Sequence, residues 1–340
     1  MARCISIPCA VLLSVVCLMG CGESGVCKYV SPGKQCGPGA IGSCSSFGSD
    51  YACWCGHCIP EECTGDLSRV ILDYQLEEKI RYAASKPDGV LRYEHVWNIE
   101  VAPFDANPSD LEEFVILLDG LQCLTALEEL DLSHNSLDDL GPLGELRHLV
   151  NLKLISAVGN DIDALAEVER LRELDLSENG IDDISPLAGL TDLRKLVLAE
   201  NDVDDLAPLA GMVRLEELDL EYNHVVDLDP LADMRHMQKL VVWPSGIEDI
   251  QALAGMPLLE HLDLAGGRIE DISPLAGLEY LSYVRLFSND IRDISPLVAN
   301  PGLDQGDEVV LIDNPLDCQA QADNIQALRD RGVEISTDCD

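Results

Sequence analysis

The chain has 340 residues and a formal net charge of −40, because 62 Asp and Glu residues outnumber 22 Lys and Arg residues. A field of this sign repels polyanions, so we expect no binding to nucleic acid or to anionic lipid headgroups. The sequence contains no phosphate-binding loop, no metal-ligand histidine pair and no nucleophile elbow. We therefore expect no cofactor, no metal ion and no catalysis.

Residues 1–20 have the layout of a bacterial signal peptide. They carry one charge, on Arg3, and an apolar run that ends in LMGC at residues 18–21. The run is shorter than the roughly 20 residues that a membrane span needs. Its ending resembles the lipobox of bacterial lipoproteins, which implies that the sulfur of Cys21 is lipidated and that Cys21 becomes the mature N-terminus.

The resemblance predicts a protein that is exported and held at the cell envelope. Nothing after residue 21 is apolar enough to span a bilayer, so the lipid would be its only membrane attachment. By resemblance to Gram-negative lipoproteins, Gly22 points to the outer membrane or cell surface in a Gram-negative cell. The alternatives are an ordinary cleaved signal peptide and an uncleaved anchor.

Residues 21–66 are predicted to form a small cysteine-rich module. Seven cysteines follow Cys21 in a segment that is rich in Gly, Ser and Pro and has too few apolar residues for a core. In an exported protein this composition indicates stabilisation by disulfides. The sequence does not give their connectivity. Because seven is odd, one of these cysteines pairs with Cys123, or both stay free.

Two other kinds of site could be drawn from the same segment. A zinc site would use Cys53, Cys55, Cys58 and Cys63 with His57, and a redox site would use the C-x-x-C motif within that set. Export to an oxidising compartment argues against zinc. The redox motif lacks the βαβ pattern that normally houses it.

Residues 67–95 are predicted to form a helical N-terminal cap. Asp73 can cap a helix in which Leu76, Ile80 and Ala84 share a face, and a Lys-Pro pair ends it. An irregular first coil follows, with a strand expected at residues 99–101. We expect a looped insertion at residues 103–110, which is a secondary candidate for binding.

A 22-residue pattern, L-x-x-L-x-L-x-x-N-x-I-x-D-I-x-P-L-x-x-L, occurs in eight successive copies between Leu127 and Leu286 without one insertion. Apolar residues two apart in L-x-L point to the same side of a short strand. The later Ile and Leu residues turn inward from the opposite side of the coil. One turn buries little, whereas stacked turns bury a continuous core. The pattern predicts a solenoid over residues 96–316.

The repeats resemble leucine-rich repeats of the internalin-like, 22-residue type, as the segment LRELDLSENGIDDISPL at residues 171–187 illustrates. The resemblance implies an α/β fold, namely a right-handed solenoid with a parallel sheet on its concave side. Short 3₁₀ segments would lie on the convex side. It also implies that the protein binds other proteins through the concave strand residues.

An Asn column follows the strands, at the position where a side-chain amide can satisfy backbone groups of neighbouring turns. We interpret the column as structural. Ala157, Ser245 and Gly267 interrupt it, so the turns there must use a different hydrogen-bond pattern. The column contains Asn135, Asn179, Asn201, Asn223, Asn289 and Asn314.

An unbroken Asp column lies further along each repeat. A ladder of calcium ions is one interpretation, because hard cations bind several carboxylates. The alternative is local: each Asp precedes a turn and can accept hydrogen bonds from its backbone N–H groups. One carboxylate per turn offers too few ligands for calcium, which favours the local interpretation. The column contains Asp139, Asp161, Asp183, Asp205, Asp227, Asp249, Asp271 and Asp293.

Function is expected in the strand positions that the repeat leaves free. The N-terminal two-thirds of this face are mostly acidic, interrupted by a basic cluster at Lys153, Arg172, Arg194 and Lys195. Aromatic residues follow, and four of the five aromatics after Leu127 fall in these columns. Interfaces concentrate such anchors, whereas a solvated sheet has no need of them. The candidate partner-binding residues are Tyr222, Trp243, Tyr283, Phe287, Val241, His261 and Glu221.

The sequence thus favours a non-catalytic protein that binds a protein partner through its fifth to eighth repeat strands. Glycan binding is the alternative, with the aromatic rings stacking on sugars and Asp219, Glu221 and Asp263 accepting their hydroxyls. A glycosidase-like pair of Asp219 and Glu221 is a third possibility. No spacing distinguishes this pair from the acid pairs of other repeats, which argues against catalysis.

Residues 317–340 are predicted to form a C-terminal cap. A helix is expected where Ala322, Ile325 and Leu328 recur at helical spacing, with Gly332 as its stop and a final strand at residues 333–335. A disulfide between Cys318 and Cys339 would staple this cap over the last coil. Closing a loop of this size contributes about 3 kcal/mol.

Overall fold

The computed structural model describes residues 51–54, 57–60, 63, 66–67, 70–96, 98–106 and 114–339. The predicted signal peptide and Cys21 lie outside these residues. The chain forms two compact units: Met1–Glu100 with Leu117–Ala126, called here the N-terminal unit, and Val101–Ile116 with Leu127–Asp340, called the repeat unit. No helix in the described part is long and apolar enough to cross a membrane. The segment boundaries expected from the sequence stay predictions.

The N-terminal unit contains a two-stranded antiparallel sheet and short helices. Its elements are β1 (Tyr51–Trp54), β2 (His57–Pro60), α1 (Tyr74–Ala83), α2 (Tyr93–Val96) and the 3₁₀ helix η4 (Leu121–Cys123). Helix α1 begins where the sequence predicts, because the Oδ1 atom of Asp73 accepts hydrogen bonds from the backbone N–H groups of Gln75 and Leu76 at 2.8 and 3.0 Å. Leu76 and Ile80 are buried.

A disulfide joins Cys63 to Cys123 across 60 residues of sequence within this unit. Both side chains are fully buried. The bond resolves the alternative that the sequence left open, since Cys123 does pair with a cysteine of the module. It also removes Cys63 from the possible zinc ligands. In the chain-entropy model, closing a loop of this length stabilises the fold by about 4 kcal/mol.

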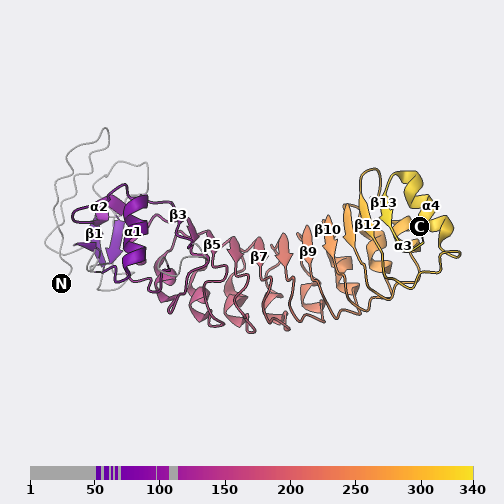
Figure 1. Ribbon diagram of the computed structural model, residues 1–340, viewed down its shortest axis with the longest axis horizontal. Coiled ribbons are helices and arrows are strands. Elements are labelled where there is room, and N and C mark those ends of the chain that lie inside the picture. Colours follow the sequence, from indigo (N-terminus) through magenta and orange to yellow (C-terminus); the bar gives the residue numbers. More distant parts are fainter. Residues whose placement is uncertain are drawn as a thin grey trace, which may run out of the picture. The chain divides into compact units, whose positions relative to one another are not determined.

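The repeat unit is a leucine-rich-repeat solenoid with an 11-stranded parallel sheet, in which every strand pairs with its neighbours in sequence. The strands stand side by side in one row on the concave side, with the short helical segments opposite (Figure 1). The fold predicted from the repeat pattern is therefore confirmed. The strands are β3 (Val101–Pro103), β4 (Glu129–Asp131), β5 (Asn151–Lys153), β6 (Glu173–Asp175), β7 (Lys195–Val197), β8 (Glu217–Asp219), β9 (Lys239–Val241), β10 (His261–Asp263), β11 (Tyr283–Arg285), β12 (Glu308–Val310) and β13 (Glu334–Ser336).

Each strand buries its middle residue, and the next inward residue follows two positions later, as in Leu218 and Leu220 of β8. The residues between them face outward on the concave side. Opposite the sheet, inward Ile and Leu residues close the core from 3₁₀ turns, several of which begin with Pro at their first or second position. These segments are η5 (Gly141–Glu145), η6 (Asp163–Glu167), η7 (Ser185–Gly189), η8 (Ala207–Leu209), η9 (Asp229–Leu231), η10 (Gln251–Gly255), η11 (Ser273–Gly277) and α3 (Ser295–Ala299).

The strand of the first coil differs from the prediction. The sequence predicted a strand at residues 99–101, but β3 begins at Val101 and pairs Ala102 with Leu130 of β4. Ala102 and Phe104 are the inward residues of this coil, with exposed fractions of 1% and 2%, while Val101 is 53% exposed. The prediction was wrong because it gave the strand to two β-branched residues, whereas the register needs the inward pair that aligns with β4.

The Asn side chains tie neighbouring turns together. In Asn201, the side-chain N–H group donates to the carbonyl oxygens of Leu176 and Leu198, each at 2.9 Å. Its Oδ1 atom accepts from the backbone N–H of Ile181 at 2.9 Å. The other five members of the column repeat this pattern of donating to backbone carbonyls and accepting a backbone N–H of the preceding turn. Buried Asn300, which the sequence analysis missed, similarly donates to Leu275 and Leu278.

The Asp column makes the local turn contact in every repeat. In each case Oδ1 accepts a hydrogen bond from the backbone N–H two residues later, at 2.7 to 3.2 Å. Such a bond lowers the pKa of Asp183 and of Asp293, aided by the Ser hydroxyl that follows each of them. Among the described residues, no group of three or more His, Cys, Asp or Glu side chains is placed to hold a metal ion. This geometry supports the structural interpretation of the column.

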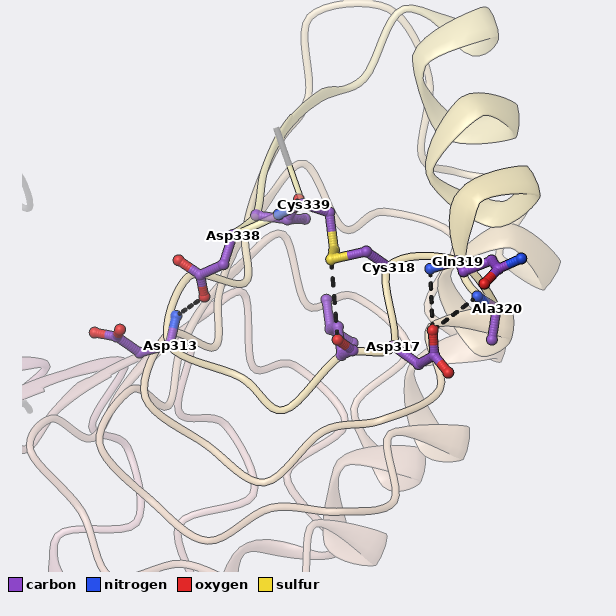
Figure 2. The surroundings of a disulfide bond; sticks show 9 residues. Asp313, Asp317, Cys318, Gln319, Ala320, Asp338 and Cys339 are labelled. Carbon is purple, nitrogen blue, oxygen red and sulfur yellow. Dashed lines mark hydrogen bonds between the residues drawn. A yellow bond between two sulfur atoms is a disulfide. The ribbon is translucent and has the colours of Figure 1, made fainter.

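The C-terminal cap consists of α4 (Ala322–Arg331) and β13, as expected. Gly332 ends α4 with a φ of 93°, in the left-handed region that favours glycine. The disulfide predicted between Cys318 and Cys339 is present, with its Cα atoms 5.2 Å apart. Figure 2 shows hydrogen bonds on both sides of it: Asp313 donates its backbone N–H to Asp338, and Asp317 accepts from two backbone N–H groups at the approach to α4.

Candidate partner-binding surface

Three outward-facing columns make up the concave face. The first and second columns are the first and third residues of each strand, and the third column follows the next buried residue. Parallel pairing aligns each column across the sheet, so that Lys239, His261 and Tyr283 are neighbours in the first column. A residue's column and strand therefore decide which side chains it can contact.

Opposite charges alternate across β7 to β9. Lys195 pairs with Glu217 at 3.0 Å, Arg194 with Glu216 at 2.7 Å, and the Nζ of Lys239 lies 3.6 Å from Asp219. The hydrogen bond to Glu217 raises the pKa of Lys195. Arg194 and Lys195, half of the basic cluster expected from the sequence, are thus occupied by neighbours within the sheet and offer less positive charge to a ligand.

Tyr222, Trp243 and Phe287 form a continuous aromatic cluster. The ring centroids of Tyr222 and Trp243 are 4.9 Å apart in an edge-to-face arrangement, and those of Trp243 and Phe287 are 6.2 Å apart. Trp243 and Phe287 share the third column with one strand between them, a separation of about 10 Å along the sheet. Their rings lean toward each other past Ala265, which is buried. The structure thus brings together three of the predicted residues.

The side chain of Tyr222 follows a backbone with positive φ. Tyr222 has a φ of 54°, and the equivalent residues of several other repeats, including Glu178, Glu200 and Ser288, also have positive φ values. At the same repeat position, Gly266 also has a positive φ, whereas Pro244 cannot have one, because its ring fixes φ near −65°. The Trp243–Pro244 peptide bond is cis. Tyr222 is 48% exposed, which makes it the most accessible member of the aromatic cluster.

A second group lies beside this cluster on β10 and β11. The rings of His261 and Tyr283 stack with centroids 4.2 Å apart. The guanidinium of Arg285 lies 5.0 Å from the centroid of Phe287 and pairs with Asp263 at 2.7 Å. Sequence reasoning missed Arg285. Its position in the second column, two residues before Phe287, was the available signal.

Two predicted residues differ in what they offer to a ligand. Val241 is only 6% exposed and presents little surface. Glu221 is partly exposed, and among the described residues its carboxylate has no hydrogen-bond or ion-pair partner. Burial raises the pKa of Glu221, and the negative charges of Asp219 and Asp263 add to the effect.

Burial also shifts the pKa values of two neighbours. It raises the pKa of Asp263, although Arg285 acts in the opposite direction. It lowers the pKa of His261, and the positive charge of Lys239 reinforces this. The surface therefore combines partly buried carboxylates and aromatic rings with an imidazole whose pKa is lowered.

The pair of Asp219 and Glu221 was the sequence's candidate for catalysis. The Oδ1 atom of Asp219 accepts a hydrogen bond from the backbone N–H of Glu221 at 3.1 Å. Asp131, Asp175 and Asp263 make the same contact with the residue two positions later. The hydrogen bond between the carboxylate of Asp219 and a backbone N–H is therefore a structural contact that recurs in alternate repeats.

The comparisons with known proteins agree with the fold. Family models described as "Leucine Rich repeats (2 copies)" and "Leucine Rich Repeat" match residues 169–211 and 126–149. No curated protein gives a significant match to the sequence. Among solved structures, a leucine-rich-repeat protein of Leptospira interrogans is 18% identical with a TM-score of 0.55, over 65% of this chain and 63% of that one. This likeness shows the fold alone.

Two internalins of Listeria monocytogenes are more similar in sequence. Internalin F is 25% identical with a TM-score of 0.55, over 80% of this chain and 93% of that one. Internalin C2 is 30% identical with a TM-score of 0.60, over 64% of this chain and 94% of that one. Leucine-rich-repeat proteins are typically non-catalytic scaffolds for protein interactions, so the fold supports a protein-binding role. The chain belongs to the internalin-like leucine-rich-repeat proteins.

Proposed function

We propose that this protein is a non-catalytic binding protein that holds a protein partner on the concave face of strands β8 to β11. The observation that carries the proposal is the aromatic cluster on an outward face, in which the ring of Trp243 lies next to those of Tyr222 and Phe287. Large aromatic side chains supply much of the energy of protein interfaces when a partner covers them. His261, Tyr283 and Arg285 extend the same surface toward β11.

A photocrosslinking experiment tests the location of the site. A photoreactive amino acid replaces Phe287 in one version of the protein and Tyr280 in another. Tyr280 is a matched control, because it is 59% exposed but lies in a turn outside the strands. We expect a discrete protein adduct from position 287 and none from position 280. Equal adducts from both positions would contradict the proposed site.

Substitution then measures how much the cluster contributes. Trp243→Ala should weaken binding of the captured partner by about 30-fold, the effect of losing an interface anchor worth about 2 kcal/mol. Tyr280→Ala should leave the dissociation constant unchanged. Circular dichroism and the unfolding midpoint establish that both variants remain folded. Unchanged affinity in folded Trp243→Ala would rule out the cluster as the binding site.

Glycan binding is a second candidate that uses the same residues. It is favoured by the neighbouring positions of Glu221 and Trp243 in the third column, and by the negative charge of Asp219 acting on Glu221, since lectin-like sites combine rings with hydroxyl acceptors. A glycan array separates the two candidates. Saturable binding to a defined glycan that is lost in Trp243→Ala would favour the glycan. Binding only to protein or peptide would favour our proposal.

We also propose that the protein is exported and lipid-anchored at the cell envelope, on the strength of the lipobox-like sequence at residues 18–21. In a Gram-negative cell the proposed location is the outer membrane or cell surface.

Cys21→Ala should move the protein from the membrane fraction to the soluble fraction, because the acyl groups on Cys21 are the membrane attachment that we propose. Retention of Cys21→Ala in washed membranes would contradict it.

A further inference from the structure

The concave face contains the same arrangement twice, two repeats apart. On β10 and β11, Arg285 lies between the carboxylate of Asp263 and the ring of Phe287. On β8 and β9, the residues in the same columns 44 positions earlier are Asp219, Val241 and Trp243. The carboxylate and the ring recur, while a buried valine stands where the arginine is.

The arrangement around Val241 has one more carboxylate in its columns than the arrangement around Arg285. Glu221 lies at the position that Ala265 occupies in the second arrangement, so a second carboxylate flanks the ring of Trp243. Two positive groups of the described concave face already have acidic partners: Lys239 lies 3.6 Å from Asp219, and Arg285 pairs with Asp263. Among the described residues, no cation pairs with the carboxylate of Glu221.

We propose that the partner is a protein with a basic segment, and that a Lys or Arg side chain of that segment lies over Val241 between Trp243 and Glu221. This inference rests on the proposed concave binding site and names the chemistry of its ligand. The ring would contact the cation face-on, and the carboxylate would neutralise it, as Phe287 and Asp263 do for Arg285. The net charge of −40 would attract such a segment over a distance.

The raised pKa of Glu221 is consistent with this arrangement. Burial and like charges disfavour its ionised form in the free protein, and a bound cation would relieve that cost. Binding of a basic segment should therefore release a proton when the pH lies near the pKa of Glu221.

The probe for the test is a random peptide library displayed on phage and selected on the purified full chain. Peptides whose binding is lost in Trp243→Ala are synthesised, and their dissociation constants are measured. We expect these peptides to be enriched in Lys and Arg. Changing the critical basic residue of such a peptide to Glu should weaken binding by at least about tenfold, because attraction becomes repulsion.

Two protein variants test the position of the cation. Glu221→Gln should raise the dissociation constants of the basic peptides by about fivefold. Val241→Arg should weaken binding of these peptides further, because the new side chain would occupy the place of the peptide's cation. Strand β11 accommodates an arginine, Arg285, at the same strand position. The matched control is Glu173→Gln, which removes the same charge from β6 on the same face and should leave affinity within about twofold.

The outcomes separate this inference from the proposed function. The cationic ligand would be ruled out if the peptides that need Trp243 lack basic residues. It would also be ruled out if they bind Glu221→Gln and folded Val241→Arg as tightly as the original chain. Either outcome would leave the proposed concave site unchanged. A library that yields no peptide dependent on Trp243 would overturn both.

Discussion

At the scale of single residues, the stability of this solenoid depends on polar groups inside an apolar core. A parallel strand of three residues leaves many backbone groups without partners at the bends that follow it. The Asn column satisfies them, because one amide can donate twice and accept from a further N–H group. Where Ser245 replaces Asn, its Oγ atom is the one buried side-chain polar atom in the described residues without a hydrogen-bond partner.

Asn201→Ala should lower the free energy of unfolding by about 2–4 kcal/mol, because it removes the acceptor of the backbone N–H groups of Ile181 and Asn179. It also removes one of the two amide donors to each of the carbonyls of Leu176 and Leu198. Chemical denaturation followed by circular dichroism measures the effect. Asn160→Ala is the control, since Asn160 is exposed and should change stability by less than about 0.5 kcal/mol. Equal effects of the two substitutions would show that the column does not carry this stability.

His261 gives the candidate surface a dependence on pH. Its pKa is lowered from the ordinary value of 6.5, so the folded protein holds this proton less tightly than the unfolded chain does. The contribution of the neutral ring is therefore present above about pH 6.5 and is lost as the pH falls through the lower folded-state pKa. His261→Gln has no such proton. Between pH 7 and 5, the unfolding temperature of the original chain should fall more than that of His261→Gln. Parallel curves would contradict the shift.

At the scale of elements, the closeness of successive turns differs along the repeat unit. Gly255 and Gly277 end the 3₁₀ segments η10 and η11 at equivalent positions. A Cβ atom added to Gly255 would lie 1.9 Å from the carbonyl oxygen of Ala232, whereas one added to Gly277 would meet nothing within 4 Å. The same repeat position is thus restricted in one turn and open in another.

Gly255→Ala should therefore lower the free energy of unfolding by about 3 kcal/mol or more, because the backbone of the preceding turn has to move. Gly277→Ala should be neutral or stabilising by up to about 1 kcal/mol, since it restricts only the unfolded chain. Denaturation midpoints of the two variants measure the difference. If Gly255→Ala were as stable as Gly277→Ala, turn η10 would have to be looser than the structure indicates.

The sequence predicted those elements that the repeat itself specifies. The L-x-L spacing located the strands from β4 to β11, and Asp73 located the start of α1. It did not locate β3, because that coil uses Ala102 and Phe104 in place of leucines. Nor did it determine that Cys63 is the partner of Cys123, since pairing depends on how the chain brings distant segments together.

The candidate site was predicted in its columns but not in its contacts. Period and register placed Tyr222, Trp243 and Phe287 on one face, and the structure adds that the ring of Trp243 lies 4.9 and 6.2 Å, between centroids, from those of Tyr222 and Phe287. The role of Arg285 and the burial of Val241 were missed, because both depend on which side chains lie opposite in adjacent strands. Ion pairs with Glu216 and Glu217 likewise occupy Arg194 and Lys195, two residues of the predicted basic cluster.

At the scale of the whole molecule, the excess of acidic residues opposes folding through mutual repulsion. The exposed ion pairs between repeats, such as Arg268 with Glu248 at 2.9 Å, offset this only slightly, since each contributes about 0.2–1 kcal/mol. Salt screens both effects, but a net charge of −40 leaves far more repulsion than attraction to be screened.

The unfolding temperature should therefore rise as NaCl is increased from about 0.01 M to 0.15 M, over which the Debye length falls from about 30 to 8 Å. CaCl₂ at the same ionic strength distinguishes screening from a specific site. Because each Asp of the turn column uses Oδ1 for a backbone N–H, as Asp249 does with Gln251, we expect calcium to add no saturable stabilisation. A saturable rise at submillimolar calcium that disappears in Asp249→Asn and Asp271→Asn would instead establish a calcium site between those two turns.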